Sequence, residues 1–135
     1  MEKLELEATL ENLDEVLAFV DGYLENVDCP MKSQLQVDVA VEETFVNIVH
    51  YAYAPGTGPA TILLNIGQDP LSITLVFMDK GVPFDPLAHE DPDVTLSLEE
   101  RKIGGLGIFL VKKNMDEIHY EYKDGYNILT ISKAL

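Results

Sequence analysis

Residues 40–53 constrain the fold of this chain more than any other stretch, because they form a largely apolar helical pattern interrupted by two polar residues. Glu43 and Asn47 are four residues apart, so at about 100° per residue they stand one turn apart on one helix face. A carboxylate and an amide in this arrangement suit a base beside an oxygen ligand for a hard cation. They also suit a solvated or capping glutamate beside a core asparagine that bonds its own helix, because such polar pairs are often structural. The stretch alone leaves both interpretations open.

The residues before this stretch predict a strand and a first helix. Alternating apolar residues over positions 3–9 are typical of an edge strand, and apolar positions at helical spacing predict a helix that ends near residue 26. We expect Asn12 and Glu15 to form a capping box at the start of that helix. The long helix should begin directly after Pro30 and continue to Tyr53, where a proline- and glycine-rich stretch ends it.

The rest of the chain predicts a third helix and two pairs of strands. The helix should begin near Gly105, and Asp124-Gly125 is a typical two-residue hairpin turn. Because strands and helices are segregated along the chain, we expect an α+β fold: a mixed, mostly antiparallel sheet with helices on one face. At this length, residues 1–135 should form one domain. The predicted strands cover residues 60–66, 71–78, 117–123 and 126–133.

The charge and the apolar pattern exclude several classes of function. A net charge of -15 without a basic stripe argues against direct binding of nucleic acid, whose phosphates it would repel. A single cysteine excludes an internal disulfide and a cysteine-based zinc cluster. The first residues lack a signal-peptide core, and no apolar run is long enough to span a membrane, so we expect a cytoplasmic protein with no membrane contact.

Asp79 ends a predicted strand and is followed two residues later by Gly81. A carboxylate in this position can accept a hydrogen bond from an exocyclic amine, and the glycine would let a flat ring approach the backbone. An aspartate and a glycine are also ordinary residues in a turn that ends a strand. This motif alone therefore leaves the presence of a ligand site open.

Glycines precede the third predicted helix in the stretch Gly104-Gly105-Leu106-Gly107. Free backbone N–H groups at a helix start bind phosphate oxygens when no side chains obstruct them. The stretch matches neither the P-loop nor the dinucleotide fingerprint, and it would also suit a hinge with a close helix–sheet contact. On the last predicted strand, Thr130 lies between two apolar residues and is by itself an ordinary strand residue.

Taken in order and with their spacing, these motifs closely resemble the motif series of the GHKL ATPases, which bind ATP in the Bergerat fold. More narrowly, the chain resembles the anti-sigma-factor serine kinases over nearly its whole length. The resemblance implies a two-layer sandwich of the Bergerat type. It also implies that ATP and Mg²⁺ are bound and that an acidic lid, about residues 86–104, covers the nucleotide.

The resemblance implies a role for each motif. Glu43 matches the carboxylate that orients or deprotonates the attacking group, and Asn47 matches the ligand of Mg²⁺. Asp79 matches the acceptor for the adenine amino group, supported by Gly81 and Thr130. The remaining residues are implied in contacts with the phosphates, with Lys102 as an alternative lid cation: Arg101, Gly104, Gly105, Leu106 and Gly107.

One position departs from the family pattern. The family often carries a histidine four residues after the asparagine, whereas this chain has Tyr51 there and His50 before it. His50 lies about 20° from Glu43 around the helix, so it can be read as a tuning group for that carboxylate or as a packing or solvent-edge histidine.

Three functions compete at this point. The first is an ATP-dependent serine protein kinase that sequesters a sigma factor and phosphorylates an anti-sigma-factor antagonist protein, with a homodimer left open. The second is a nucleotide-gated binding module without transfer. The third is a histidine-kinase catalytic domain, against which we count the lack of a preceding dimerisation helix in this sequence. Glu43 favours the kinase, since a pure binder needs no base there.

Overall fold

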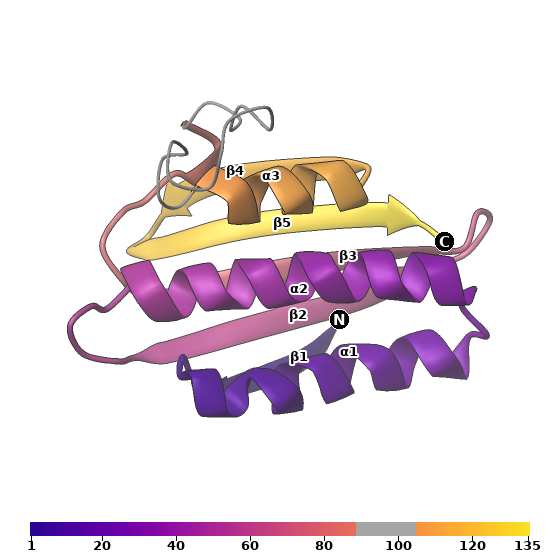
Figure 1. The fold of residues 1–135 in the computed structure, drawn as a ribbon, viewed down its shortest axis with the longest axis horizontal. Coiled ribbons are helices and arrows are strands. Elements are labelled where there is room, and N and C mark those ends of the chain that lie inside the picture. Colours follow the sequence, from indigo (N-terminus) through magenta and orange to yellow (C-terminus); the bar gives the residue numbers. More distant parts are fainter. Residues whose placement is uncertain (89–104) are drawn as a thin grey trace.

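The computed structural model describes residues 1–88 and 105–135, and within them five strands form one sheet that three α-helices cover on one face (Figure 1). This arrangement confirms the expected α+β fold with two layers. Two short 3₁₀ turns, Leu10–Asn12 and Pro86–Ala88, accompany the main elements. The helices are α1 (Leu13–Asn26), α2 (Met31–Tyr51) and α3 (Gly105–Asn114), and the strands are β1 (Glu2–Glu7), β2 (Pro59–Gly67), β3 (Ser72–Asp79), β4 (Glu117–Lys123) and β5 (Tyr126–Ala134).

The sheet has the strand order β1-β2-β3-β5-β4, and each of these neighbouring pairs is antiparallel. The predicted edge strand is confirmed, because β1 pairs with β2 alone among the described strands. The predicted hairpin turn is also confirmed, since Asp124 and Gly125 both have positive φ values, 54° and 84°, as a type I′ turn requires. The order matters for function because it places β5 beside β3, so the residues that end β3 lie next to those that begin β5.

The core lies between the three helices and the central strands, and strand alternation decides which strand side chains enter it. Phe45 of α2 and Phe77 of β3 are the largest fully buried side chains. In the described part of the chain, the helices lack an apolar run of the length that crosses a bilayer. Since α2 buries one face on the sheet, its polar residues Glu43 and Asn47 lie to one side of this core.

Two predictions about helix ends are wrong. Asn12 makes no capping hydrogen bond through its side chain, because it ends a 3₁₀ turn with φ −89° and ψ −1° rather than the extended conformation of a typical N-cap. Its Nδ2 atom donates to the backbone oxygen of Glu7 instead, at 2.8 Å. At the other helix, α2 ends at Tyr51 and not at Tyr53, two residues before the expected end.

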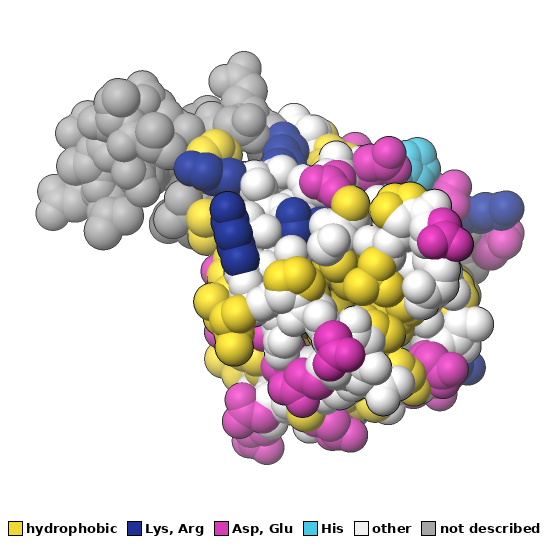
Figure 2. All heavy atoms as spheres, turned by 90° about the vertical axis from the view of Figure 1, so that its right-hand side faces the viewer, with side chains coloured by type: hydrophobic (Ala, Val, Ile, Leu, Met, Phe, Trp, Pro, Cys, Tyr) yellow, Lys and Arg dark blue, Asp and Glu magenta, His cyan; other side chains and the backbone are white. Residues whose placement is uncertain are grey.

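Several carboxylates lie where α1 packs on α2. The protein as a whole is strongly acidic, and Figure 2 shows acidic side chains around an apolar area at one end of the molecule. Asp38 of α2 is half-buried, and its Oδ1 atom has no hydrogen-bond partner within the described residues. Burial, then a hydrogen bond with Asp21 and the negative charges of Asp21, Glu25 and Glu42, raises the pKa of Asp38 to about 7 from an ordinary 3.8. The folded state therefore favours the protonated form of this side chain.

The free energy of unfolding should consequently fall as the pH rises from about 4 to about 7. In this range the folded state binds a proton at Asp38 that the unfolded chain releases. We expect Asp38→Asn, which carries a permanent donor toward Asp21, to remove this fall. The variant should be more stable than wild type at pH 8 by on the order of 1 kcal/mol after solvent screening, and similar at pH 4.

Urea unfolding at pH 4 to 8 measures this difference, with Asp124→Asn, in the exposed hairpin turn, as a control for the loss of one charge elsewhere. If wild type and Asp38→Asn show parallel pH profiles, Asp38 is not the group responsible.

Candidate functional site

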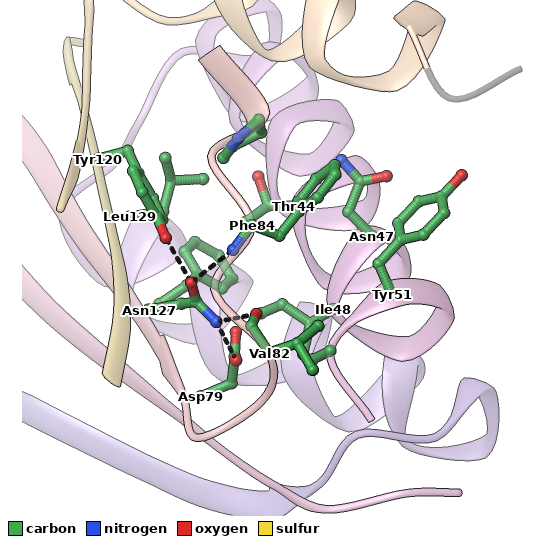
Figure 3. A pocket seen from close by; sticks show the side chains of 13 residues that line it. Thr44, Asn47, Ile48, Tyr51, Asp79, Val82, Phe84, Tyr120, Asn127 and Leu129 are labelled. Atoms are coloured by element: carbon green, nitrogen blue, oxygen red, sulfur yellow. Dashed lines mark hydrogen bonds between the residues drawn. The ribbon is translucent and has the colours of Figure 1, made fainter. Parts of the chain in front are cut away.

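A cavity of about 50 Å³ lies between α2 and the sheet, at the end where β3 finishes and β5 begins (Figure 3). The α2 side chains come from its last two turns, and the segment after β3 closes part of the opening. The cavity thus combines residues that are far apart in the sequence. Its lining residues are Thr44, Asn47, Ile48, Tyr51, Ala52, Phe77, Asp79, Val82, Phe84, Pro86, Tyr120, Asn127 and Leu129.

Asp79 is the last residue of β3 and is only 5% exposed. Its Oδ1 atom accepts hydrogen bonds from the backbone N–H of Gly81 and from Nδ2 of Asn127, both at 2.9 Å. Burial raises the pKa of Asp79, whereas these two hydrogen bonds lower it and favour the ionised form. Because both donors use Oδ1, the Oδ2 atom has no hydrogen-bond partner in the described part of the chain and can accept one from a ligand.

Asn127, near the start of β5, holds Asp79 in this orientation and was missed in the sequence analysis. Its Oδ1 atom accepts from the Tyr120 hydroxyl and from the Phe84 backbone N–H, while Nδ2 also donates to the Val82 oxygen at 2.9 Å. A backbone N–H only donates and a carbonyl only accepts, so the amide has one orientation that satisfies all its partners. The alternation of β5 could have indicated this role, because Asn127 lies on the same buried face of the strand as Leu129 and Ile131.

The prediction that Thr130 supports Asp79 is wrong. Thr130 pairs with Val76, whereas Asp79 pairs with Asn127, three residues earlier on β5. Successive side chains of a strand point to opposite faces, so Thr130 lies on the face of the sheet turned away from the helices. Asn127 makes the contact that we expected from Thr130.

The structure gives a physical reason for a glycine at position 81. A Cβ atom at Gly81 would lie 2.2 Å from the backbone oxygen of Ala52, just after the end of α2. The same oxygen accepts a hydrogen bond from the Val82 N–H at 3.0 Å. Gly81 therefore permits close contact with the helix end, and its expected role in letting a flat ring approach the backbone stays a prediction.

Asn47 and Glu43, the two polar residues one turn apart on α2, lie between the cavity and the first turn of α3. Asn47 lines the cavity, and a Cβ atom added to Gly107 would lie 3.7 Å from Asn47 Oδ1 and 2.9 Å from Glu43 Oε2. Burial, followed by the negative charge of Glu42, raises the pKa of the half-buried Glu43. The structure thus brings Glu43, Asn47 and Gly107 together, and the raised pKa makes Glu43 a stronger base once it is ionised.

The aromatic residues near the end of α2 define one side of the opening. Tyr51 stacks on Phe84 with ring centroids 5.4 Å apart and an interplanar angle of 18°. His50 is exposed and meets the Tyr51 ring edge-on at 6.3 Å. An exposed histidine at this point agrees with the solvent-edge interpretation.

Several predicted site residues lie outside the described residues: Arg101, Lys102, Gly104 and nearly all of the expected lid. Gly105 and Leu106 open α3, which begins where the sequence predicted. The predicted roles of all these residues in contacts with a ligand stay predictions.

The chain is similar to proteins of known family. Residues 6–133 match the family described as the histidine kinase-like ATPase domain. The chain is 28% identical over 129 residues to the serine/threonine-protein kinase BtrW of Bordetella bronchiseptica, covering 96% of this chain and 90% of BtrW. It is 30% identical over 95 residues to the serine-protein kinase RsbW of Bacillus cereus, covering 67% of this chain and 58% of RsbW. The match with RsbW thus spans little more than half of that protein.

Solved structures show a similar fold. The crystal structure of the RsbU and RsbW domains of a Mycobacterium tuberculosis protein superposes with a TM-score of 0.68 and 15% identity, over 100% of this chain and 33% of that one. The structure of the SiaB–SiaC complex from Pseudomonas aeruginosa gives a TM-score of 0.59 and 17% identity, over 98% and 89%.

Proposed function

The chain belongs to the histidine kinase-like ATPase domain family, and from this premise we propose that it is an ATP-dependent serine protein kinase that acts as an anti-sigma factor. In this proposal it works in the cytoplasm, sequesters a sigma factor and phosphorylates an antagonist protein that competes with that sigma factor. The observation that carries the proposal is the half-buried Glu43 carboxylate beside the first turn of α3, next to the Asp79 cavity. Relatives with 28% and 30% identity are named as serine/threonine and serine kinases, which supports the same reaction.

The two ends of the site suggest how the nucleotide is oriented. The adenine would bind at Asp79, whose Oδ2 atom can accept a hydrogen bond from the amino group. The phosphates would then extend past Asn47 toward α3, since a helix N-terminus with small residues favours anions. In this orientation the terminal phosphate lies on the Glu43 side of the site.

Asn47 fits a role as a magnesium ligand. Mg²⁺ usually keeps several waters and takes one or two protein oxygens together with substrate phosphates, so one amide oxygen is enough. Within the described residues, no three side chains of the His, Cys, Asp or Glu type are grouped to hold a metal, and a site shared with phosphates needs no such group. When bound, Mg²⁺ would neutralise charge on the phosphates.

Glu43 would act on the incoming serine. The serine oxygen forms a bond to the terminal phosphorus while the bond from that phosphorus to the bridging oxygen of ADP breaks. Glu43 accepts the proton of the serine hydroxyl, and ADP leaves. The raised pKa of Glu43 brings this base closer to neutral pH.

The direct test is transfer of labelled phosphate. We expect the protein, isolated from its native cell with its bound partners and incubated with Mg²⁺ and γ-labelled ATP, to place the label on serine of a small partner protein. Mass spectrometry would identify that protein and the modified serine. Omission of Mg²⁺ provides the control.

A second candidate function is a nucleotide-gated binding module, because the Asp79 end of the site would serve a binder equally well. Absence of transfer to any partner, while ATP still changes which partner is retained, would refute the kinase proposal in favour of this module.

A further inference from the structure

Thr44 is a buried polar residue of the cavity to which the proposed reaction assigns no role. It lies on α2 directly after Glu43, is 3% exposed and lines the cavity. Its Oγ1 atom is buried and has no hydrogen-bond partner in the part of the chain that the structure describes. Buried hydroxyl groups on helices usually bond a preceding backbone carbonyl, and an unpaired one destabilises the fold. A partner is therefore missing at this point of the cavity wall.

Several other polar atoms of the cavity already have hydrogen-bond partners. The Asn127 amide has partners for both its oxygen and its nitrogen, the Tyr120 hydroxyl donates to Asn127, and Asp79 Oδ1 accepts from two donors. Thr44 belongs to α2 and Asp79 to β3, so the two residues line one cavity from different elements (Figure 3). Apolar side chains complete the wall, as is typical of a pocket for a planar ring.

A purine ring with a 6-amino group matches the combination of the Thr44 hydroxyl and Asp79 Oδ2. The amino group is a donor and suits Asp79 Oδ2, and the ring nitrogens on either side of it, N1 and N7, are pure acceptors. A hydroxyl can serve such an acceptor because it supplies one O–H donor. Thr44 and Asp79 both line the cavity, so a ring bound there can meet both side chains.

We propose that Thr44 is a base-specificity residue whose hydroxyl donates a hydrogen bond to a ring nitrogen next to the 6-amino group of the bound adenine. This inference rests on the proposed binding of ATP. It adds a second polar contact to the base, from α2, beside the contact from β3.

The test is Thr44→Val, which keeps the shape of the side chain and removes the hydroxyl. We expect the affinity for ATP to fall by about 3- to 10-fold, as for the loss of one uncharged hydrogen bond. We expect the thermal midpoint of the free protein to stay the same or rise, because the variant removes an unpaired buried hydroxyl. Opposite signs for binding and stability separate a ligand contact from a structural role.

Analogues of ATP identify the atom that Thr44 contacts. Calorimetry with 1-deaza-ATP and 7-deaza-ATP should show that wild type loses affinity for one of them, while Thr44→Val binds that analogue as well as it binds ATP. Thr44→Ser should recover most of the affinity. Thr74→Val, a matched change on the outward face of β3, should bind like wild type.

Three results would overturn the inference. The first is an unchanged affinity of Thr44→Val for ATP, and the second is a lower thermal midpoint of the free variant. The third is that Thr44→Val loses the same factor of affinity for ATP, 1-deaza-ATP and 7-deaza-ATP. Failure of wild type to bind any adenine nucleotide would instead refute the proposed function.

Discussion

Replacing Glu43 with glutamine is expected to lower the rate of phosphate transfer to serine by about 10²–10⁴-fold, the usual cost of losing a general base. Glutamine keeps the size of the side chain but cannot take the proton of the serine hydroxyl. Binding of Mg-ATP should survive, because the proposed metal ligand is Asn47 and the residue proposed to contact the adenine ring is Asp79. Calorimetry of Mg-ATP binding and single-turnover transfer from labelled ATP measure the two effects separately.

The pH profile provides a second readout for Glu43. Because burial raises its pKa and only the ionised carboxylate accepts a proton, the wild-type rate should rise with pH through the pKa of Glu43 and then level off. Glu43→Gln should lose this rise. Glu42→Gln is the matched control, since Glu42 is exposed and about 100° away around the helix. It should keep the rise and reach nearly the wild-type rate at high pH, but the rise should move to lower pH, because the charge of Glu42 helps to raise the pKa of Glu43. Equal transfer by wild type and Glu43→Gln would show that another group is the base.

Replacing Asp79 with asparagine is expected to weaken ATP binding by roughly 10- to 150-fold, since a hydrogen bond to a charged group contributes about 1.5–3 kcal/mol. In the variant, the carboxamide oxygen can still accept from Gly81 and Asn127. Its NH₂ group then takes the position of Oδ2 and meets the adenine amino group, donor against donor. The fold should persist, because burial already raises the pKa of Asp79 and a neutral side chain relieves that cost.

Calorimetry with ATP and GTP tests this assignment. GTP has a carbonyl oxygen where adenine has its amino group, so wild type should discriminate against GTP, and Asp79→Asn should lose most of that discrimination. Asp69→Asn, in the turn before β3, is the matched control and should bind ATP like wild type. Equal affinity of wild type for ATP and GTP would contradict the assignment of the adenine site to Asp79.

Much of the fold follows from local patterns in the sequence. Alternation of apolar residues predicted the strands, and helical spacing of apolar residues predicted the three helices, because each period places one set of side chains on the buried face. Asp124 and Gly125 predicted their own turn, since the required positive φ depends on those residue types. The spacing of Glu43 and Asn47 determined that both lie on one side of α2.

The tertiary structure decided which side chains meet. Asp79 and Asn127 are 48 positions apart, and their hydrogen bond exists because β5 lies beside β3 in a particular register. A shift of that register by one residue would have placed Thr130 on the cavity side, as we expected from the resemblance. Gly81 is likewise explained only by the approach of the backbone at Ala52.

Periodicity along the chain determined which face of each element is buried, because that depends on neighbours three, four or two residues away. Periodicity could not determine which residue of another element faces a given side chain across the cavity. The unpaired hydroxyl of Thr44 is an example, since its sequence neighbours predict a helix but do not reveal whether a partner is in reach. That depends on strand order, register and the position of α2 over the sheet, all of which arise from contacts between residues far apart in the sequence.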